Sequence, residues 1–272
     1  HLIALPVLEM KVSEKKQIQF SLVLPAYNEE ENIDLAVTQA ITLLQRMFSE
    51  YEVVVVNDGS TDQTGFRAET LARKYPGLIR VLHHPTNRGY GAALRTGLFN
   101  AQGQLIFYTD ADNQFDLNEL ATFLPLIKGY DIVVGYRQHR QDSFLRRFLS
   151  KGYNWLTRCL FGIYLKDIDC SFKLFRRSAI ENLQIVSDDF LVDTELMVRA
   201  HLKNLAIFEK GVTHRPRTRG RSSIRPSHIP KTFISLLRLW GKLFLPRCKQ
   251  SRPEKQKQNT GQALSFREND QQ

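Results

Sequence analysis

The stretch LIFYTDADNQ, residues 105–114, decides the fold of this chain. An apolar run ends abruptly at Asp110 and Asp112, two carboxylates one residue apart. Such a run is typical of a strand buried on both faces of a parallel sheet, and the ends of such strands are where ligands bind. Two carboxylates suit Mg²⁺ or Mn²⁺, which prefer oxygen ligands and share them with substrate phosphates.

Working outward, similar apolar runs alternate with helical patterns. Strands are expected at residues 20–24, 53–56, 79–82, 105–109 and 132–135, with a helix near 118–127. Pro25 is expected to end the first strand, because proline lacks a ladder donor. This alternation predicts an α/β fold with a parallel sheet, right-handed crossovers and helices on both faces. Dinucleotide and Walker glycine fingerprints are absent from the sequence.

Composition indicates a globular protein. The 272 residues, 42% of them hydrophobic, suffice for one large α/β domain or two small ones. Three cysteines without a Cys-x-x-Cys pair favour neither a disulfide framework nor a zinc site and fit a reducing compartment. No uncharged apolar run approaches the ~20 residues of a transmembrane helix, and no signal pattern opens the chain. We therefore expect a cytoplasmic location.

Positive charge is concentrated in the last quarter of the sequence. Residues 210–257 hold fourteen Lys or Arg and one acid, within a formal net charge of +10. Nucleic acid, anionic lipid and phosphate substrates all fit such a segment, and net charge does not choose among them. Residues 143–161 and 232–245 predict amphipathic helices with basic and Trp/Phe/Leu faces. Helices of this kind can lie in a membrane interface. The alternative is that both helices simply pack on the sheet.

Three motifs, PAYNE at 25–29, NDGSTD at 57–62 and DADNQ at 110–114, follow the first, second and fourth expected strands. Together and in this order, they resemble the inverting family-2 glycosyltransferases of the GT-A fold. The resemblance is to the dolichyl- and polyprenyl-phosphate sugar synthases typified by dolichyl-phosphate mannose synthase, and it runs from about residue 20 to 225. It implies a Rossmann-like, mostly parallel sheet followed by amphipathic interface helices.

The resemblance also implies a donor site. The positions that match nucleoside contacts are Pro25, Tyr27, Glu29, Val56 and Asp58, the last accepting an N–H of the base. Gly89 and Gly91 would let the backbone approach the donor closely. Asp110, Asp112 and Gln114 match the metal and diphosphate site, where Mg²⁺ or Mn²⁺ offsets negative charge on the leaving nucleotide. Asp112 is also expected to be catalytic.

Further matches concern the acceptor. Arg137 resembles an arginine that holds a phosphate, and Arg146 with Lys151 falls where the family keeps basic residues. Asp169 lies in an acceptor-side segment, residues 167–173, and is expected to be catalytic together with Arg137. The motif RTRGRS at 217–222, beginning with Arg217, fits an Arg-x-x-Gly-x-Ser phosphate-binding loop.

Three positions leave alternatives open. Ser223 stands where the family usually has Lys, so Arg221 or Arg225 would supply the charge. Glu195 matches a recurring acidic position, with a capping or supporting carboxylate as the alternative. His214 is expected to be structural.

The implied activity is transfer of a hexose from a UDP- or GDP-sugar to dolichyl or undecaprenyl phosphate, with inversion. A phosphate is already an anion near neutral pH and needs no general base, whereas a hydroxyl acceptor would need Asp169 or Asp193 to take its proton. The rivals are a family-2 transferase acting on a sugar or protein hydroxyl, which Ser223 favours, and a basic nucleic-acid-binding protein. A nucleotidyltransferase is disfavoured, because no glycine-rich loop follows the first strand.

The expected organisation is a polar lead-in at 1–18, a catalytic domain at 19–228, a basic membrane-proximal helix at 229–248 and a disordered tail at 249–272. The expected partners are a nucleotide sugar, a polyprenyl phosphate and the cytoplasmic face of a membrane. Nucleic acid is not an expected partner.

Overall fold

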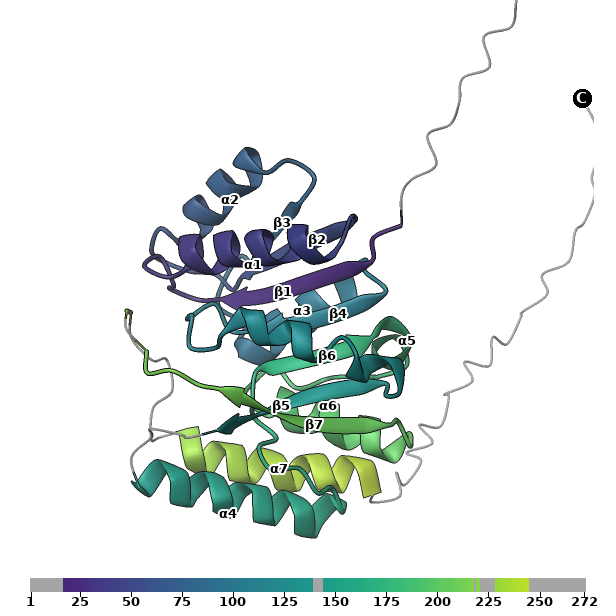
Figure 1. Cartoon of the computed structure of the whole chain (residues 1–272). Helices are drawn as coiled ribbons and strands as arrows, with labels where there is room; N and C mark the ends of the chain where they lie inside the picture. Colours follow the sequence, from purple (N-terminus) through teal and green to yellow (C-terminus); the bar gives the residue numbers. More distant parts are fainter. Residues whose placement is uncertain (1–16, 139–143, 218, 221–227, 245–272) are drawn as a thin grey trace, which may run out of the picture.

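The computed structural model describes residues 17–138, 144–217, 219–220 and 228–244 (Figure 1). Most of the expected lead-in and all of the expected tail lie outside these ranges. The side chains of Arg146 and Ser223 also lie outside what the structure describes.

A single mixed sheet of seven strands, in the order β3-β2-β1-β4-β6-β5-β7, forms the centre of the described structure. The strands are β1 Phe20–Ala26, β2 Tyr51–Asn57, β3 Ile79–His83, β4 Leu105–Thr109, β5 Ile132–Gln138, β6 Phe172–Arg176 and β7 Ile207–Thr213. All neighbours are parallel except at β6, which runs antiparallel to both β4 and β5. The predicted mostly parallel sheet is therefore confirmed, with β6, which the sequence did not predict, as its one antiparallel strand.

Helices cover both faces of the sheet, as expected (Figure 1). They are α1 Ile33–Met47, α2 Thr64–Lys74, α3 Tyr90–Asn100, α4 Phe144–Phe161, α5 Arg177–Glu181, α6 Val192–Leu202 and α7 His228–Phe244. The core on one face contains α1 and α2, and the core on the other contains α3, α5 and α6. Beyond β7, α4 and α7 pack side by side (Figure 1).

The helix expected near residues 118–127 is wrong. Two 3₁₀ helices occupy this region, η1 Leu117–Thr122 and η2 Leu126–Lys128. Pro125 stands between them and precedes η2. Because proline has no backbone N–H and its ring crowds the preceding turn, one continuous α-helix cannot run through this position.

Pro25 does not end the first strand, contrary to expectation, since β1 continues to Ala26. The carbonyl oxygen of Ala26 accepts from the N–H of Asp58, beyond β2, so Pro25 faces the opposite side of β1. On that side β4 pairs with β1 only as far as Val23. The missing N–H of Pro25 therefore costs no ladder bond.

A buried cluster of polar side chains joins β4, β6 and α6. Antiparallel pairing places Lys173 opposite Tyr108. The fully buried ammonium of Lys173 lies 2.5 Å from Asp193 Oδ1, 2.9 Å from the Tyr108 hydroxyl and 2.7 Å from the carbonyl oxygen of Cys170. Tyr108 also donates to Asp193. All three donors of the ammonium are thus satisfied, as a buried charge requires.

Replacing Lys173 by Met should destabilise the fold by about 3–5 kcal/mol, because Asp193 would keep a buried charge without its cation. The double variant Lys173→Met, Asp193→Asn should regain most of this loss, since it removes the charge and keeps an acceptor for Tyr108. Urea unfolding measures both values. A single variant as stable as the unmodified protein, or a double variant no better than the single one, would contradict the role given to this pair.

Candidate active site

The loops that carry the three motifs meet at one edge of the sheet, where the parallel strands end. The backbone N–H of Asn28 donates to Ser60 Oγ at 3.0 Å, which joins the loops after β1 and β2. Asn113 Nδ2 donates to the carbonyl oxygen of Asn32 at 3.1 Å, which joins the loop after β4 to the start of α1. The structure therefore brings the predicted motifs to one place.

Asp110 carries the most informative side chain at this edge. Its Oδ2 atom accepts a hydrogen bond of 2.5 Å from Ser171 Oγ. Its Oδ1 atom is buried and makes no hydrogen bond of normal geometry among the described residues. The buried hydroxyl of Tyr90, which also makes none, lies close enough to Asp110 to lower the pKa of this carboxyl. Burial, followed by the charge of Asp112, raises the pKa of Asp110 from 3.8 to about 7. A buried acceptor left without a donor calls for a ligand, and a hard divalent cation fits it.

Asp112 and Gln114 complete the predicted metal-binding set. Asp112 Oδ1 accepts from the backbone N–H of Gln114 at 3.2 Å, and burial raises the pKa of Asp112. The side-chain nitrogen of Gln114 donates to the carbonyl oxygen of Arg215 at 2.9 Å. Across the described ranges, no group of three or more His, Cys, Asp or Glu side chains forms a complete metal cage. One or two carboxylates completed by substrate phosphates is a usual arrangement for Mg²⁺.

Arg217 faces this carboxylate pair from the segment that follows β7. Its Nη1 atom lies 4.0 Å from Asp112 Oδ2. Its Nη2 atom donates to both carboxylate oxygens of Glu29, and Asn32 Nδ2 donates to Glu29 at 2.7 Å. Burial raises the pKa of Glu29 in spite of these donors. Glu29, predicted as a nucleoside contact, therefore holds a guanidinium next to the predicted metal ligands.

The other predicted nucleoside contacts, Tyr27, Val56 and Pro25, differ in how far their side chains are exposed. Tyr27 is 37% exposed, so its ring is open to a ligand. The side chain of Val56 is buried in the core next to Gly97 of α3, which leaves only its backbone near the edge. Pro25 is buried in β1.

Asp58 is almost fully buried and is engaged with protein groups. Its carboxylate pairs with His84 Nδ1 at 2.6 Å and accepts the N–H groups of Arg88 and Gly89 at 2.9 Å each. In this structure it fixes the segment that leads into α3. His84 is a residue that the sequence reasoning missed.

Gly89 and Gly91 lie against the protein backbone of another segment rather than against an open donor site. A Cβ atom on Gly91 would lie 2.5 Å from the carbonyl oxygen of Asp189. Gly89 has a φ of +96°, a conformation that glycine adopts readily, and it also lies against this segment. The two glycines thus allow residues 187–189 to pack against the start of α3.

Glu195 holds the same segment from α6. The fully buried carboxylate accepts the N–H groups of Val186 at 3.0 Å and Ser187 at 2.7 Å, and Arg199 Nε donates to it at 2.7 Å. This is the supporting role that the sequence left open as the alternative to catalysis.

The predicted acceptor residues cluster beside β6. Arg137 forms a bidentate ion pair with Asp167, in which Nε donates to Oδ2 at 2.6 Å and Nη2 donates to Oδ1 at 2.7 Å. Burial, then the charges of Asp193 and Asp167, raises the pKa of Asp169 from 3.8 to about 7. His214 packs edge-on against Phe115, with ring centroids 5.0 Å apart, which agrees with a structural role.

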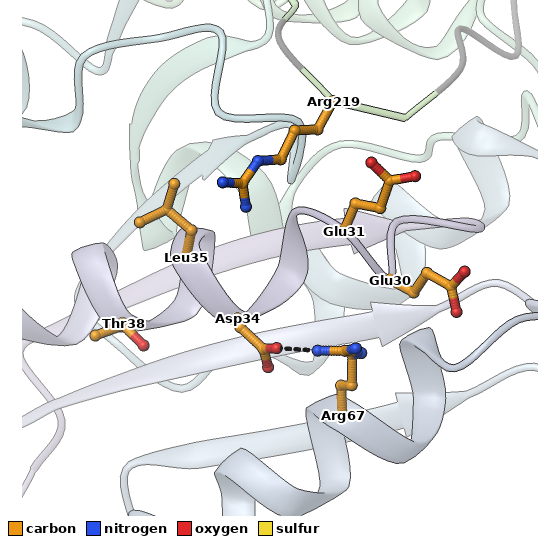
Figure 2. A pocket seen from close by; sticks show the side chains of 7 residues that line it. All are labelled: Glu30, Glu31, Asp34, Leu35, Thr38, Arg67 and Arg219. Atoms are coloured by element: carbon orange, nitrogen blue, oxygen red, sulfur yellow. Dashed lines mark hydrogen bonds and ion pairs between the residues drawn. The ribbon is translucent and has the colours of Figure 1, made fainter.

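A separate pocket of about 730 Å³ lies at the start of α1 (Figure 2). Its lining residues are Glu30, Glu31, Asp34, Leu35, Thr38, Arg67 and Arg219. Two of them, Asp34 and Arg67, form an ion pair of 2.5 Å, drawn as a dashed line in Figure 2. Acids outnumber bases in this lining, and of the predicted motifs only RTRGRS contributes to it, through Arg219. The pocket therefore does not suit a diphosphate.

Comparison with known proteins identifies the family. Residues 21–184 match the model of the family described as Glycosyl transferase family 2. The chain belongs to this family. A Trichomonas vaginalis protein named dolichyl-phosphate beta-glucosyltransferase ALG5C is 34% identical over 73% of the chain, and the human dolichyl-phosphate beta-glucosyltransferase is 32% identical over 71%. The chain spans 64% and 66% of the lengths of these two family 2 relatives.

Solved structures support the fold of this family 2 chain. Glucosyl-3-phosphoglycerate synthase from Mycobacterium tuberculosis, in complex with phosphoglyceric acid, superposes with a TM-score of 0.64 at 21% identity. The match covers 82% of this chain and 80% of that one. It bears out the predicted α/β fold of GT-A type. Within the described ranges, every helix is too short or too polar to cross a bilayer.

The raised pKa of Asp110 predicts a pH effect on the metal-free protein. This carboxyl binds a proton more tightly when folded, so the stability it contributes is present below pH 3.8 and is lost as the pH rises towards about 7. Asp110→Asn should flatten this decline in part, because Asp169, with a similarly raised pKa, keeps its own contribution. Urea unfolding with a chelator across this pH range tests it.

The matched control is Glu181→Gln, which changes an exposed carboxylate on α5. An identical pH slope in Asp110→Asn and in the unmodified protein would show that Asp110 titrates normally.

Proposed function

We propose that this chain transfers a hexose from a nucleoside diphosphate sugar to a polyprenyl phosphate, with inversion and with Mg²⁺ or Mn²⁺. The observation that carries the proposal is the buried Oδ1 of Asp110, which makes no hydrogen bond of normal geometry and lies, with the unpartnered hydroxyl of Tyr90, at the same edge as Asp112 and Arg217. The names of the relatives support the acceptor class. Besides those above, a Rhizobium johnstonii protein named dodecaprenyl-phosphate galacturonate synthase is 31% identical over 86% of the chain.

Asp110, Asp112 and Gln114 would hold the divalent cation. A cation held there would offset the negative charge that grows on the leaving nucleotide. A structure of the mycobacterial synthase contains both Mn²⁺ and uridine diphosphate, which supports this reading of the edge. Tyr27 offers an exposed ring for a base, next to the loop that carries Glu29.

Arg217 and Arg137 would position the charged groups. A phosphate monoester, with a second pKa of ~6, is already an anion near pH 7 and can attack without losing a proton to the protein. A planar guanidinium binds phosphate oxygens in two places and keeps its charge at every relevant pH. The chain therefore needs to orient and neutralise its substrates rather than to remove a proton.

A hydroxyl acceptor is the second candidate, and Asp169 is the observation that favours it. A carboxyl with a pKa raised to about 7 can take a proton from a hydroxyl near neutral pH. The name of the mycobacterial structural neighbour, glucosyl-3-phosphoglycerate synthase, indicates a small acceptor rather than a lipid.

Transfer to lipid should be lost in Asp112→Asn, by about 100-fold or more, because a ligand that holds the donor's cation is removed. Chelation of divalent metal should give the same loss in the unmodified protein. The assay offers radiolabelled UDP- and GDP-sugars with polyprenyl phosphate and counts butanol-extractable label. Asp34→Asn, an exposed carboxylate outside the site, is the control.

Labelled water-soluble products without any lipid-linked label would favour the hydroxyl acceptor. Turnover that persists after chelation would contradict the metal-dependent mechanism.

The surface of α7 supports a contact with membrane. Phe233, Ile234, Leu237 and Phe244 are 44–49% exposed, and Arg238 and Lys242 are exposed among them. Leu236 and Leu239 instead face the core. Exposed apolar side chains interspersed with cations suit the interface of an anionic bilayer.

The variant Phe233→Ser, Leu237→Ser should therefore bind anionic vesicles more weakly than the unmodified protein does. Flotation with phosphatidylserine-containing liposomes measures this binding. The control is Phe66→Ser on α2, which removes a ring that is more exposed than that of Phe233, 66% against 48%, and lies far along the chain from α7. Equal flotation of all three proteins would remove α7 from the membrane contact.

A further inference from the structure

The side chain of Ser171 lies against the predicted metal site. Ser171 is 6% exposed and stands immediately before β6. Its hydroxyl donates to Asp110 Oδ2 at 2.5 Å, whereas the buried Asp110 Oδ1 makes no hydrogen bond of normal geometry among the described residues, with the equally unpartnered hydroxyl of Tyr90 near this carboxylate. We propose that Ser171 is a positioning residue, which holds one oxygen of Asp110 so that the other is presented to the divalent cation. This inference rests on the proposed metal-dependent function.

The topology accounts for the contact. Thr109, the last residue of β4, pairs with Phe172, the first residue of β6. Because the two strands are antiparallel, the residue after Thr109 and the residue before Phe172 come next to each other beyond the last pair. Asp110 and Ser171, 61 residues apart in the chain, are therefore neighbours.

Ser171 is itself held in place. The preceding carbonyl, that of Cys170, accepts from the buried ammonium of Lys173 at 2.7 Å. That ammonium is fixed in turn by Asp193 and Tyr108. A hydroxyl on a rigid turn can orient a carboxylate more closely than one on an exposed loop, because its own position varies less.

The two predicted carboxylate ligands are oriented by different means. Asp112 accepts a backbone N–H, that of Gln114, which no side-chain substitution removes. Asp110 Oδ2 instead accepts from a side-chain hydroxyl, which a single substitution deletes. A hydroxyl supplies one donor, and a hydrogen bond to a carboxylate is about twice as strong as a neutral one. Loss of such an outer partner typically costs 10–100-fold in metal affinity.

The test measures Mn²⁺ binding rather than turnover. Mn²⁺ is titrated by water-proton relaxation enhancement into each protein, with and without UDP or GDP. Ser171→Ala should raise the Kd for Mn²⁺ by about 10–100-fold. Ser171→Thr, which keeps the hydroxyl, should stay within about 3-fold of the unmodified protein, a smaller change than the loss of an outer partner gives. Ser178→Ala, an exposed serine on α5, is the matched control, and urea unfolding verifies that each variant is folded.

Two results would overturn the inference, and they differ in what they leave standing. If Ser171→Ala binds Mn²⁺ as well as the unmodified protein while Asp110→Asn does not, the hydroxyl is only structural and the proposed metal site stands. If Asp110→Asn and the unmodified protein bind Mn²⁺ equally, the metal site and the role of Ser171 fall together.

Discussion

The antiparallel insertion of β6 between β4 and β5 is the constraint on which the site depends. A parallel strand in this place would send its first residues to the opposite edge of the sheet. Because β6 runs the other way, residues 167–171 arrive at the edge where β4 delivers Asp110 and Asp112. The contact between Ser171 and Asp110 follows directly. Carboxylates from two distant segments are thereby gathered into one small volume.

The buried carboxylates at this edge repel one another, and only some of them are paired with a cationic side chain. Asp193 is neutralised by Lys173, Asp167 by Arg137, and Glu29 by Arg217. Asp110 and Asp169 nevertheless have pKa values raised to about 7, mainly by burial and then by neighbouring carboxylates. An edge whose acids resist ionisation gains more from a divalent cation than one whose acids are already paired. This imbalance of charge supports the proposed metal site.

Sequence patterns predict the parts of this structure that depend on local hydrophobicity. Strands buried on both faces, such as β2 with its run of valines at 53–56, stand out because no polar residue interrupts them. The pattern of β6 is interrupted by Lys173, whose burial is stabilised by Asp193, 20 residues away. β7 carries Glu209 and Lys210 and is only partly buried. Both strands escaped prediction for these reasons.

The same distinction holds for the site. Motif residues after β1, β2 and β4 could be predicted to share an edge, because parallel strands end together. The contacts of Ser171 and His84 could not be predicted, because each side chain binds a carboxylate that follows another strand. Ser171, before β6, contacts Asp110 after β4, and His84, after β3, contacts Asp58 after β2. For Glu29 and Asp58 the sequence suggests a ligand contact, and the structure adds protein partners that no spacing reveals.

The pairing of the two arginines bears on how a phosphate would be received. Arg137 uses Nε and Nη2 on Asp167. Arg217 uses Nη2 on Glu29 and Nε on the carbonyl oxygen of Arg219, with Nη1 4.0 Å from Asp112. A guanidinium has five N–H donors, so each pair engages only part of its donor set. In the proposed function, a phosphate would bind the remaining N–H donors and leave each ion pair in place. Because the planar group is already oriented, less side-chain entropy would be lost on binding a phosphate. The carboxylates would then support the arginines rather than compete with the proposed substrate.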